Sequence, residues 1–306
     1  MTRDAEREAG VDWPRSFGPF ELLAELGRGG SGQVFLGRRK ADADRTLLAV
    51  KRFDAAEARR LGLFGAARRA ARLDHPDIAR VEDLGEVGTD GYVALGYVEG
   101  HDLRALMNHA HARGVGLPWA ASLSLVADTA RALDHAHRTR DFDGTPLELV
   151  HGDVSPQNLV VRPEGRVAVI DFGLGEPVGG PNPIRPRGKW AYAAPEVLER
   201  PPGDARADQW ALGVVLYELT TGRRPFGERP ASGRPAPRPG ALVPGYPAEL
   251  EAVVLTCLRP EPERRFPSLG AVAERLEALL SEARVERPRG AVRALYASLF
   301  GEAPAR

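Results

Sequence analysis

Three oxygen-bearing side chains in the middle of the sequence have the types and spacing that phosphate chemistry needs. Asp153 and Asn158 lie five residues apart, and Asp171 follows Asn158 by thirteen residues. Carboxylates and carboxamides are ligands that magnesium takes together with the phosphate oxygens of a substrate. The ordered set predicts phosphoryl transfer, in which Asp153 orients or accepts the proton of an attacking hydroxyl while Asn158 and Asp171 hold the metal. Taken singly, each residue would be an ordinary turn former.

Glycine-rich sequence near the N-terminus would suit the phosphates themselves. Four of the eight residues in Gly27–Val34 are glycine, which lets a backbone approach phosphate oxygens without a side chain in the way. Lys51 follows Gly32 by nineteen residues at the end of an apolar stretch, where its ammonium would reach the α- and β-phosphates. A tight hairpin without a ligand would also use glycines, so the loop alone is a weak signal.

The residues around the glycines predict a small antiparallel sheet. Apolar segments separated by glycine-rich or charged connections have the composition of strands, and they are Phe20–Leu26, Gln33–Leu36, Thr46–Lys51, Arg80–Glu86 and Tyr92–Val98. The stretch Asp54–Leu73, rich in Ala, Arg and Leu, favours a helix. Because a strand follows the glycines, a dinucleotide-binding fold is excluded, and the lack of Gly-Lys-Ser/Thr excludes a Walker loop.

Helices dominate from Asp102 onward. Apolar residues at three- and four-residue spacing predict an amphipathic helix that ends near His137, and Asp208–Thr221 is apolar nearly all round, as a buried helix would be. Ser268 is expected to cap the last core helix. A short strand, a proline-rich segment that cannot be helical for long and a weakly amphipathic tail are predicted at Arg166–Ile170, Arg224–Pro247 and Ala291–Phe300.

These elements predict an α+β fold with two lobes. The first is a small antiparallel β-sheet lobe with one main helix, and the second is mainly helical. We expect a flexible leader at residues 1–17, the first lobe at 18–98, the second at 99–283 and a C-terminal tail at 284–306.

Composition limits the classes of partner and compartment. Among 306 residues, Lys+Arg and Asp+Glu both number 42, so no nucleic-acid partner is expected. The single cysteine, Cys257, excludes a disulfide framework and a thiolate metal site, and is consistent with the cytoplasm. No run approaches the length of a membrane span, and the charged first residues carry no signal peptide.

With these motifs in order, the sequence resembles a eukaryotic-type (Hanks-type) bacterial serine/threonine protein kinase over about residues 20–283. Ala194-Pro195-Glu196 is similar to the end of that family's activation segment, and Asp208–Gly213 to the start of its buried helix. Arg265 stands where the family has an arginine that pairs with the glutamate matched by Glu196. The sequence around Val98-Glu99-Gly100 and Asp153–Asn158 is similar to the corresponding sequences in kinases of gliding bacteria.

The resemblance implies ATP with Mg²⁺ (or Mn²⁺) as cofactors and a protein substrate or signalling partner. Adenine would lie between Val34, Ala49 and Val160. Leu95 would be the gatekeeper, Gly96–Val98 the hinge and Asp102 a ribose contact. The full nucleotide-binding set that it implies is Leu26, Gly27, Gly29, Gly32, Val34, Ala49, Lys51, Leu95, Tyr97, Val98, Asp102 and Val160.

One departure from the family concerns the partner of Lys51. Counting back from His75-Pro76, the family's helix glutamate falls at Ala66, and Glu57 lies too early to replace it. Loss of that carboxylate would cost about 2–4 kcal/mol of transition-state stabilisation, or ~30- to 1000-fold in rate. Ala66 is therefore the main sequence argument for a pseudokinase, which binds ATP or serves as a scaffold with little transfer.

Another departure concerns regulation. Gly152 replaces the arginine that, in the family, usually binds a phosphorylated residue of the activation segment. Residues 174–193 contain no Ser or Thr, and only Tyr192 offers a hydroxyl. We therefore expect a kinase that works without activation-loop phosphorylation.

Hydroxyl and cation are exchanged at two further positions. The family usually has lysine at the position of Ser155 and threonine at that of Lys189. Our hypothesis is that Lys189 supplies the charge on the γ-phosphate from the opposite side, so the expected catalytic set is Asp153, Lys51, Ser155 and Lys189.

Two further sequence patterns suggest functions other than a protein kinase. His151-Gly152-Asp153 also resembles the loop of antibiotic phosphotransferases, which leaves a small-molecule kinase open. Two His-Ala-His pairs, beginning at His109 and His135, invite a metal hypothesis, but residues two apart on a helix point away from each other and do not chelate. His151 is expected to be a packed framework residue, since Asp153 has the catalytic position.

Overall fold

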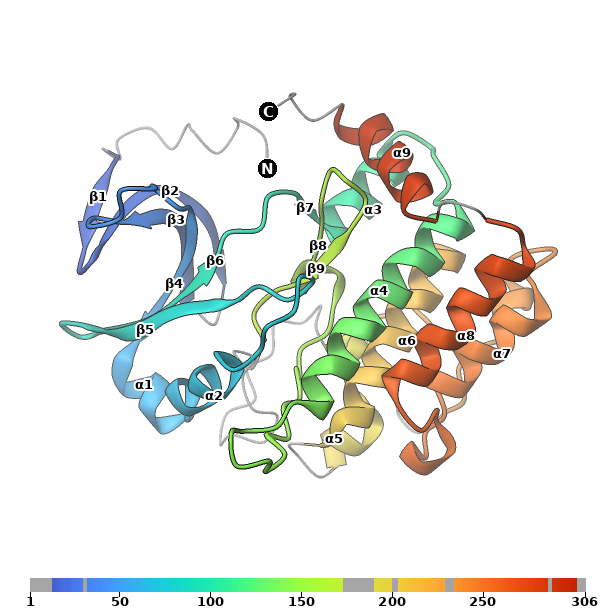
Figure 1. Ribbon diagram of the computed structural model, residues 1–306. Coiled ribbons are helices and arrows are strands. Elements are labelled where there is room, and N and C mark those ends of the chain that lie inside the picture. The colour runs from blue at the N-terminus through green and yellow to red at the C-terminus, as the bar shows by residue number, and fades with distance from the viewer. Residues whose placement is uncertain are drawn as a thin grey trace.

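The computed structural model describes residues 13–29, 32–172, 190–199, 203–228, 234–285 and 288–301. Figure 1 shows two lobes, a curled sheet at the N-terminal side and a larger set of helices at the C-terminal side. The predicted α+β, bilobal fold is confirmed.

The first lobe is built on a six-stranded antiparallel sheet. Its strand order is β1-β2-β3-β4-β6-β5, and its strands are β1 (Arg15–Phe17), β2 (Phe20–Gly29), β3 (Gly32–Arg39), β4 (Leu48–Asp54), β5 (Val81–Val87) and β6 (Asp90–Gly96). The five predicted strands are present with shifted ends. The leader prediction of residues 1–17 is wrong at its end, because Arg15–Phe17 pairs with β2.

Strand periodicity determines which side chains face the second lobe. Leu48 and Val50 of β4 pack with Phe20, Phe35 and Tyr92 in one apolar cluster. Successive side chains of a strand point to opposite faces, so Ala49 and Lys51 face the other side. The same alternation that buries β4 therefore presents Lys51 to the space between the lobes.

The predicted single helix of Asp54–Leu73 is two short helices, α1 (Ala55–Arg60) and α2 (Leu63–Ala70). Asp54 caps α1 by accepting a hydrogen bond from the Glu57 amide. Gly62 interrupts the helix and precedes α2. Propensity alone favoured one continuous helix, but glycine is the weakest helix former of this stretch.

The second lobe contains a three-stranded sheet and the remaining helices. The strands β7 (His101–Asp102), β8 (Leu159–Val161) and β9 (Val167–Val169) pair in that order. The helices are α3 (Leu103–Ala112), α4 (Trp119–Arg138), α5 (Pro195–Glu199), α6 (Ala205–Thr221), α7 (Ala248–Cys257), α8 (Leu269–Glu282) and α9 (Pro288–Phe300). The helix α6 is buried nearly all round, as predicted, and Ser268 caps α8 by accepting from the Ala271 amide.

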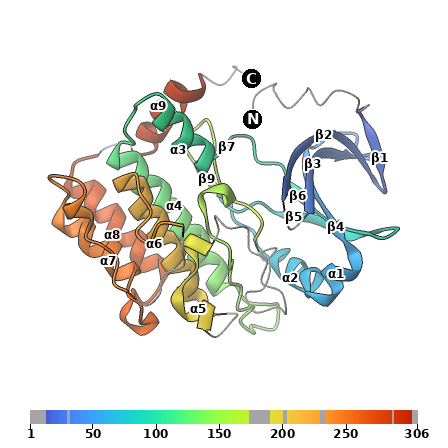
Figure 2. The ribbon, with the colours of Figure 1, turned by 180° about the vertical axis from the view of Figure 1, so that it is seen from behind.

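The predicted tail is part of the helical lobe. Its helix α9 lies beside α3 and α4, which both views show (Figures 1 and 2). Four of its side chains belong to the main apolar core, and they are Val292, Leu295, Tyr296 and Leu299. The division at residue 284 therefore does not separate a tail from the packed lobe.

The described parts of the proline-rich segment are 224–228 and 234–247, and the helical structure in them is limited to a 3₁₀ turn at Pro239–Ala241, as expected from its prolines. Within the described ranges, none of the helices combines the length and the apolar character that a membrane crossing requires.

Candidate active site

A cleft of about 230 Å³ lies between the two lobes. Its lining includes ten of the residues that the sequence assigned to a nucleotide, and these are Leu26, Gly27, Val34, Ala49, Lys51, Leu95, Tyr97, Val98, Asp102 and Val160. Asp171 also lines it. Segments from both lobes thus meet at one pocket.

The strand register brings the upper wall of the cleft together. Val34 of β3 is opposite both Gly27 of β2 and Lys51 of β4. Ala49 of β4 is opposite Leu95 of β6. Since directly paired residues in a sheet share a face, these side chains all point toward the cleft.

Gly27 and Gly29 leave open space above the cleft. A Cβ atom added at either position would meet no atom of the described residues within 4 Å. Gly32 is different, because its φ is +122° and a Cβ there would lie 2.1 Å from the Arg52 carbonyl oxygen. The fold itself requires Gly32, whereas packing requires neither Gly27 nor Gly29. Neither Gly29 nor Gly32 lines the cleft.

Lys51 is bound to a residue that the sequence analysis had assigned to the metal. Its side chain is 6% exposed, and its Nζ lies 2.9 Å from Asp171 Oδ2. Asp171 has a φ of 60°, a left-handed conformation that is uncommon for non-glycine residues and concentrates at functional sites. Although Ala66 stands in place of the family glutamate, Lys51 still has a carboxylate partner in Asp171. The sequence analysis did not predict this partner.

The loop that carries Asp153 is anchored on α6. Asp208 is fully buried and accepts the amides of His151 and Gly152, each at 2.8 Å, and the His137 Nε2–H at 2.9 Å. Burial by itself would raise the pKa of Asp208, but the His137 hydrogen bond and the neighbouring imidazoles and amide outweigh it and lower the pKa. An ionised carboxylate in the core of the lobe thus fixes the backbone before Asp153.

His151 is the framework residue that was expected. Its Nε2–H donates to the Ile170 carbonyl at 3.0 Å, and its Nδ1 accepts from the Asp153 amide at 3.1 Å. Both ring nitrogens are therefore engaged by the backbone on either side of the loop. Gly152 has a φ of +74°, so this loop has a backbone that favours glycine at the position of the family arginine.

Asp153 and Asn158 are in contact with each other, and neither they nor Ser155 line the cleft. The Asn158 Nδ2 donates to the Asp153 carbonyl at 2.8 Å and to Asp153 Oδ2 at 2.9 Å. Ser155 is fully buried, and its Oγ has no hydrogen-bond partner among the described residues. Lys189 lies outside the described residues, so the hydroxyl–cation exchange stays a prediction.

The segment after the undescribed stretch is fixed by two buried networks. Arg265 pairs with Glu196 through bonds of 2.7 and 2.8 Å, which confirms the expected pair. Tyr192 donates to Glu218 Oε2 at 2.5 Å, and Arg104 donates to both. Burial, the Glu218 charge and this hydrogen bond raise the pKa of Tyr192 above its usual range. The folded chain thus keeps the Tyr192 hydroxyl inside.

A few residues of the cleft were missed by the sequence analysis. They are Ala79, Gly100, His101, Ala105, Gln157 and Ile170, whereas Gly96 lines the cleft as part of the expected hinge. His101 is adjacent to Asp102, but nothing in its local sequence marks it as part of a pocket. The histidines of the second His-Ala-His pair have separate neighbours, since the ring of His135 packs at a tilted angle against that of His75 and His137 binds Asp208.

Comparisons with known proteins agree with this geometry. The family model of the protein kinase domain matches residues 20–238. The chain is 34% identical to the tyrosine-protein kinase MasK of Myxococcus xanthus and 32% identical to the serine/threonine-protein kinase Pkn1 of the same species, covering 90% and 89% of this chain. It covers 45% and 40% of those two proteins, so it spans less than half of their length.

Solved structures give the same result. The chain is similar to the kinase domain of Mycobacterium tuberculosis PknI, with a TM-score of 0.71 and 28% identity. The match covers 89% of this chain and 99% of that domain. Nearly the whole of that domain therefore has a counterpart in the two lobes described above.

Proposed function

The chain belongs to the protein kinase family, and from that premise we propose that it transfers the γ-phosphoryl group of ATP to a serine or threonine hydroxyl of a protein. The observation that supports this most directly is that Lys51 and Asp171 line one cleft together with the nucleotide-binding residues. Adenine fits between Val34 and Ala49 above and Val160 below.

Asp153 is proposed to orient the attacking hydroxyl. Its backbone is fixed by His151 and, through the preceding amides, by Asp208, and its carboxylate accepts from Asn158. A general base works only when it is within hydrogen-bond reach of the proton it takes. The rigid loop supports that role because it limits where the carboxylate can lie.

The donor set fits a hard divalent cation. Asn158 uses its Nδ2 on Asp153, which leaves the carboxamide oxygen for a cation, and Asp171 offers a carboxylate at the cleft. Bound Mg²⁺ would neutralise charge on the β- and γ-phosphates during transfer. The phosphates would complete the coordination, because Mg²⁺ is usually bound through one or two carboxylates together with substrate phosphates.

Transfer without activation-loop phosphorylation is part of the proposal. Gly152 stands where the arginine that reads a phosphate would stand, and Tyr192 is buried against Glu218. The Arg104–Glu218–Tyr192 network offers another way to secure the end of this segment. The protein substrate or signalling partner stays unidentified.

A pseudokinase is the second candidate, and the Lys51–Asp171 contact favours it. In the absence of a carboxylate at Ala66, Lys51 neutralises the residue that should bind the metal. If that contact persists with ATP bound, nucleotide would bind with little transfer.

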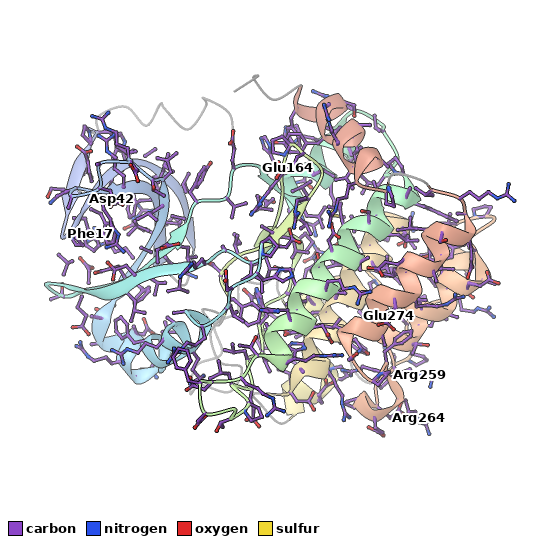
Figure 3. The ribbon with its side chains drawn as sticks, viewed as in Figure 1. Phe17, Asp42, Glu164, Arg259, Arg264 and Glu274 are labelled. Atoms are coloured by element: carbon purple, nitrogen blue, oxygen red, sulfur yellow. The ribbon has the colours of Figure 1, made fainter. Side chains whose placement is uncertain are left out.

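One experiment separates the two candidates. Purified protein is incubated with radiolabelled ATP, with and without Mg²⁺, and scored for autophosphorylation and transfer to a generic protein substrate. Asp153→Ala and Asp171→Ala are compared with Asp42→Ala, an exposed aspartate in the connection between β3 and β4 (Figure 3). Phosphoamino-acid analysis of the product distinguishes serine and threonine from tyrosine.

The proposal expects Mg²⁺-dependent transfer that survives Asp42→Ala and is lost in the other two variants. Nucleotide binding without transfer would support the pseudokinase instead. Transfer that is retained in Asp153→Ala would contradict the role of that carboxylate. Aminoglycosides and sugars under the same conditions test a small-molecule acceptor.

A further inference from the structure

One residue of the cleft is connected directly to the last helix of the chain. His101 lines the cleft next to Asp102, on the side where the ribose contact is expected. Its ring stacks on that of Phe300, with centroids 3.7 Å apart and an interplanar angle of 4°. Its Nδ1 lies 2.8 Å from the Tyr296 hydroxyl. Residues some 195 positions apart are thus joined at the edge of the pocket.

The helix α9 is held firmly enough to act as a support. Arg289 binds Asp128 of α4 through two bonds of 3.0 Å. Gly165, in the turn between β8 and β9, lies so close that a Cβ there would be 2.4 Å from the Arg289 carbonyl oxygen. Behind Phe300, the ring of His109 on α3 lies 4.8 Å away. The aromatic end of α9 is therefore flanked by His101 and by His109 of α3, and Figure 2 shows α9 beside α3.

His101 also lies within the backbone framework of the cleft. It pairs with Val161, and Asp102 pairs with Val160, the residue expected beneath the adenine. Asp102 Oδ1 accepts from the Ala105 amide at 2.8 Å and so caps α3. One carboxylate oxygen is used for the cap, and the other is left for a ribose hydroxyl. Movement of His101 would shift both Asp102 and its cap.

We propose that His101, supported by Phe300 and Tyr296 of α9, is a positioning residue that holds Asp102 for the ribose of the nucleotide. This inference rests on the proposed ATP site. It makes α9 a part of nucleotide recognition, although none of the α9 side chains lines the described cleft.

The test compares binding of ATP and 2′-deoxy-ATP to the full chain by isothermal titration, with KM and kcat for ATP measured in parallel. The variants are His101→Ala, Phe300→Leu and Tyr296→Phe, the last of which removes only the hydroxyl. Arg293→Ala, on the exposed face of α9, is the matched control. Thermal melts confirm that each variant is folded.

The wild type is expected to prefer ATP over 2′-deoxy-ATP. His101→Ala and Phe300→Leu should weaken ATP binding about 5- to 10-fold, the loss expected for one aromatic contact in a packed site. Binding of 2′-deoxy-ATP should change little, so the preference shrinks. KM for ATP should rise in these two variants, while kcat should stay within about twofold of the wild-type value. Arg293→Ala should resemble the wild type in both parameters.

Two results would overturn the inference. If the folded His101→Ala variant keeps the wild-type preference for ATP, or binds both nucleotides more weakly by the same factor, α9 is only a structural element. If the wild type binds ATP without any preference over 2′-deoxy-ATP, Asp102 has no ribose role for His101 to support. Failure of the wild type to bind ATP at all would contradict the proposed function as well, and so is distinguished from the other two.

Discussion

Replacing Arg265 by alanine should destabilise the helical lobe and impair transfer while leaving nucleotide binding intact. Its guanidinium makes five hydrogen bonds, to both oxygens of Glu196 and to the carbonyls of Arg206, Arg259 and Pro260. Five is the full donor capacity of arginine. The side chain of Arg265 is fully buried, and that of Glu196 is 22% exposed.

The magnitude follows from what the substitution leaves behind. Breaking a buried pair by removing one partner typically costs 3–5 kcal/mol, and the partial exposure of Glu196 places this pair at the lower end, about 3 kcal/mol. Arg265→Lys keeps the charge but has three donors for five acceptors, so it should recover only part of the loss. Melting temperature should fall by about 6–12 °C for Arg265→Ala.

The assay is thermal unfolding together with ATP titration and phosphoryl transfer. Arg264→Ala is the matched control, because Arg264 lies at the outer edge of the lobe (Figure 3) and is exposed. Transfer should decline because Glu196 belongs to α5, and Val197 of the same helix and the preceding Ala194 border a small cavity beside Asp153. A double-mutant cycle with Glu196→Ala should give a coupling of about 2 kcal/mol. A coupling near zero, or equal losses for Arg264→Ala and Arg265→Ala, would refute the reasoning.

Ala66→Glu should raise kcat/KM for transfer by ~30-fold or more if the missing carboxylate is what limits Lys51; an unchanged rate in a folded variant would show that Asp171 already suffices. Lys189→Thr should lower transfer and Ser155→Lys in that background should restore it, whereas a lack of rescue would rule out the hydroxyl–cation exchange. Burial lowers the pKa of His101 in the folded chain to about 4. As pH falls below about 6.5, the His101 imidazole is therefore protonated in the unfolded chain before it is protonated in the folded chain. The free energy of unfolding should for this reason decline between pH 6.5 and 4. In denaturant titrations, the free energy of unfolding of His101→Asn should decline less over that pH window than that of the wild type. Parallel plots of this free energy against pH for the two proteins would contradict this account.

Local sequence patterns allowed many of the elements that carry the site to be predicted. Apolar composition predicted the strand that carries Ala49 and Lys51, whereas the ten residues that line the cleft were implied by the resemblance to the kinase family. The cap at Ser268 and the buried helix α6 follow from short-range patterns as well. The strand, the cap and the buried helix each depend on residues within a few positions of one another, so the sequence carries them directly.

Contacts between distant segments were decided by the tertiary structure. The ion pair of Lys51 with Asp171, the enclosure of Tyr192 by Glu218, and the stacking of His101 on Phe300 join residues that no local pattern relates. Such contacts depend on how the lobes and α9 pack, because an amphipathic helix shows which face is buried but not which surface will cover it. Sequence alone therefore determined the elements and the chemistry they carry, whereas packing decided the partners of Lys51 and the role of the last helix.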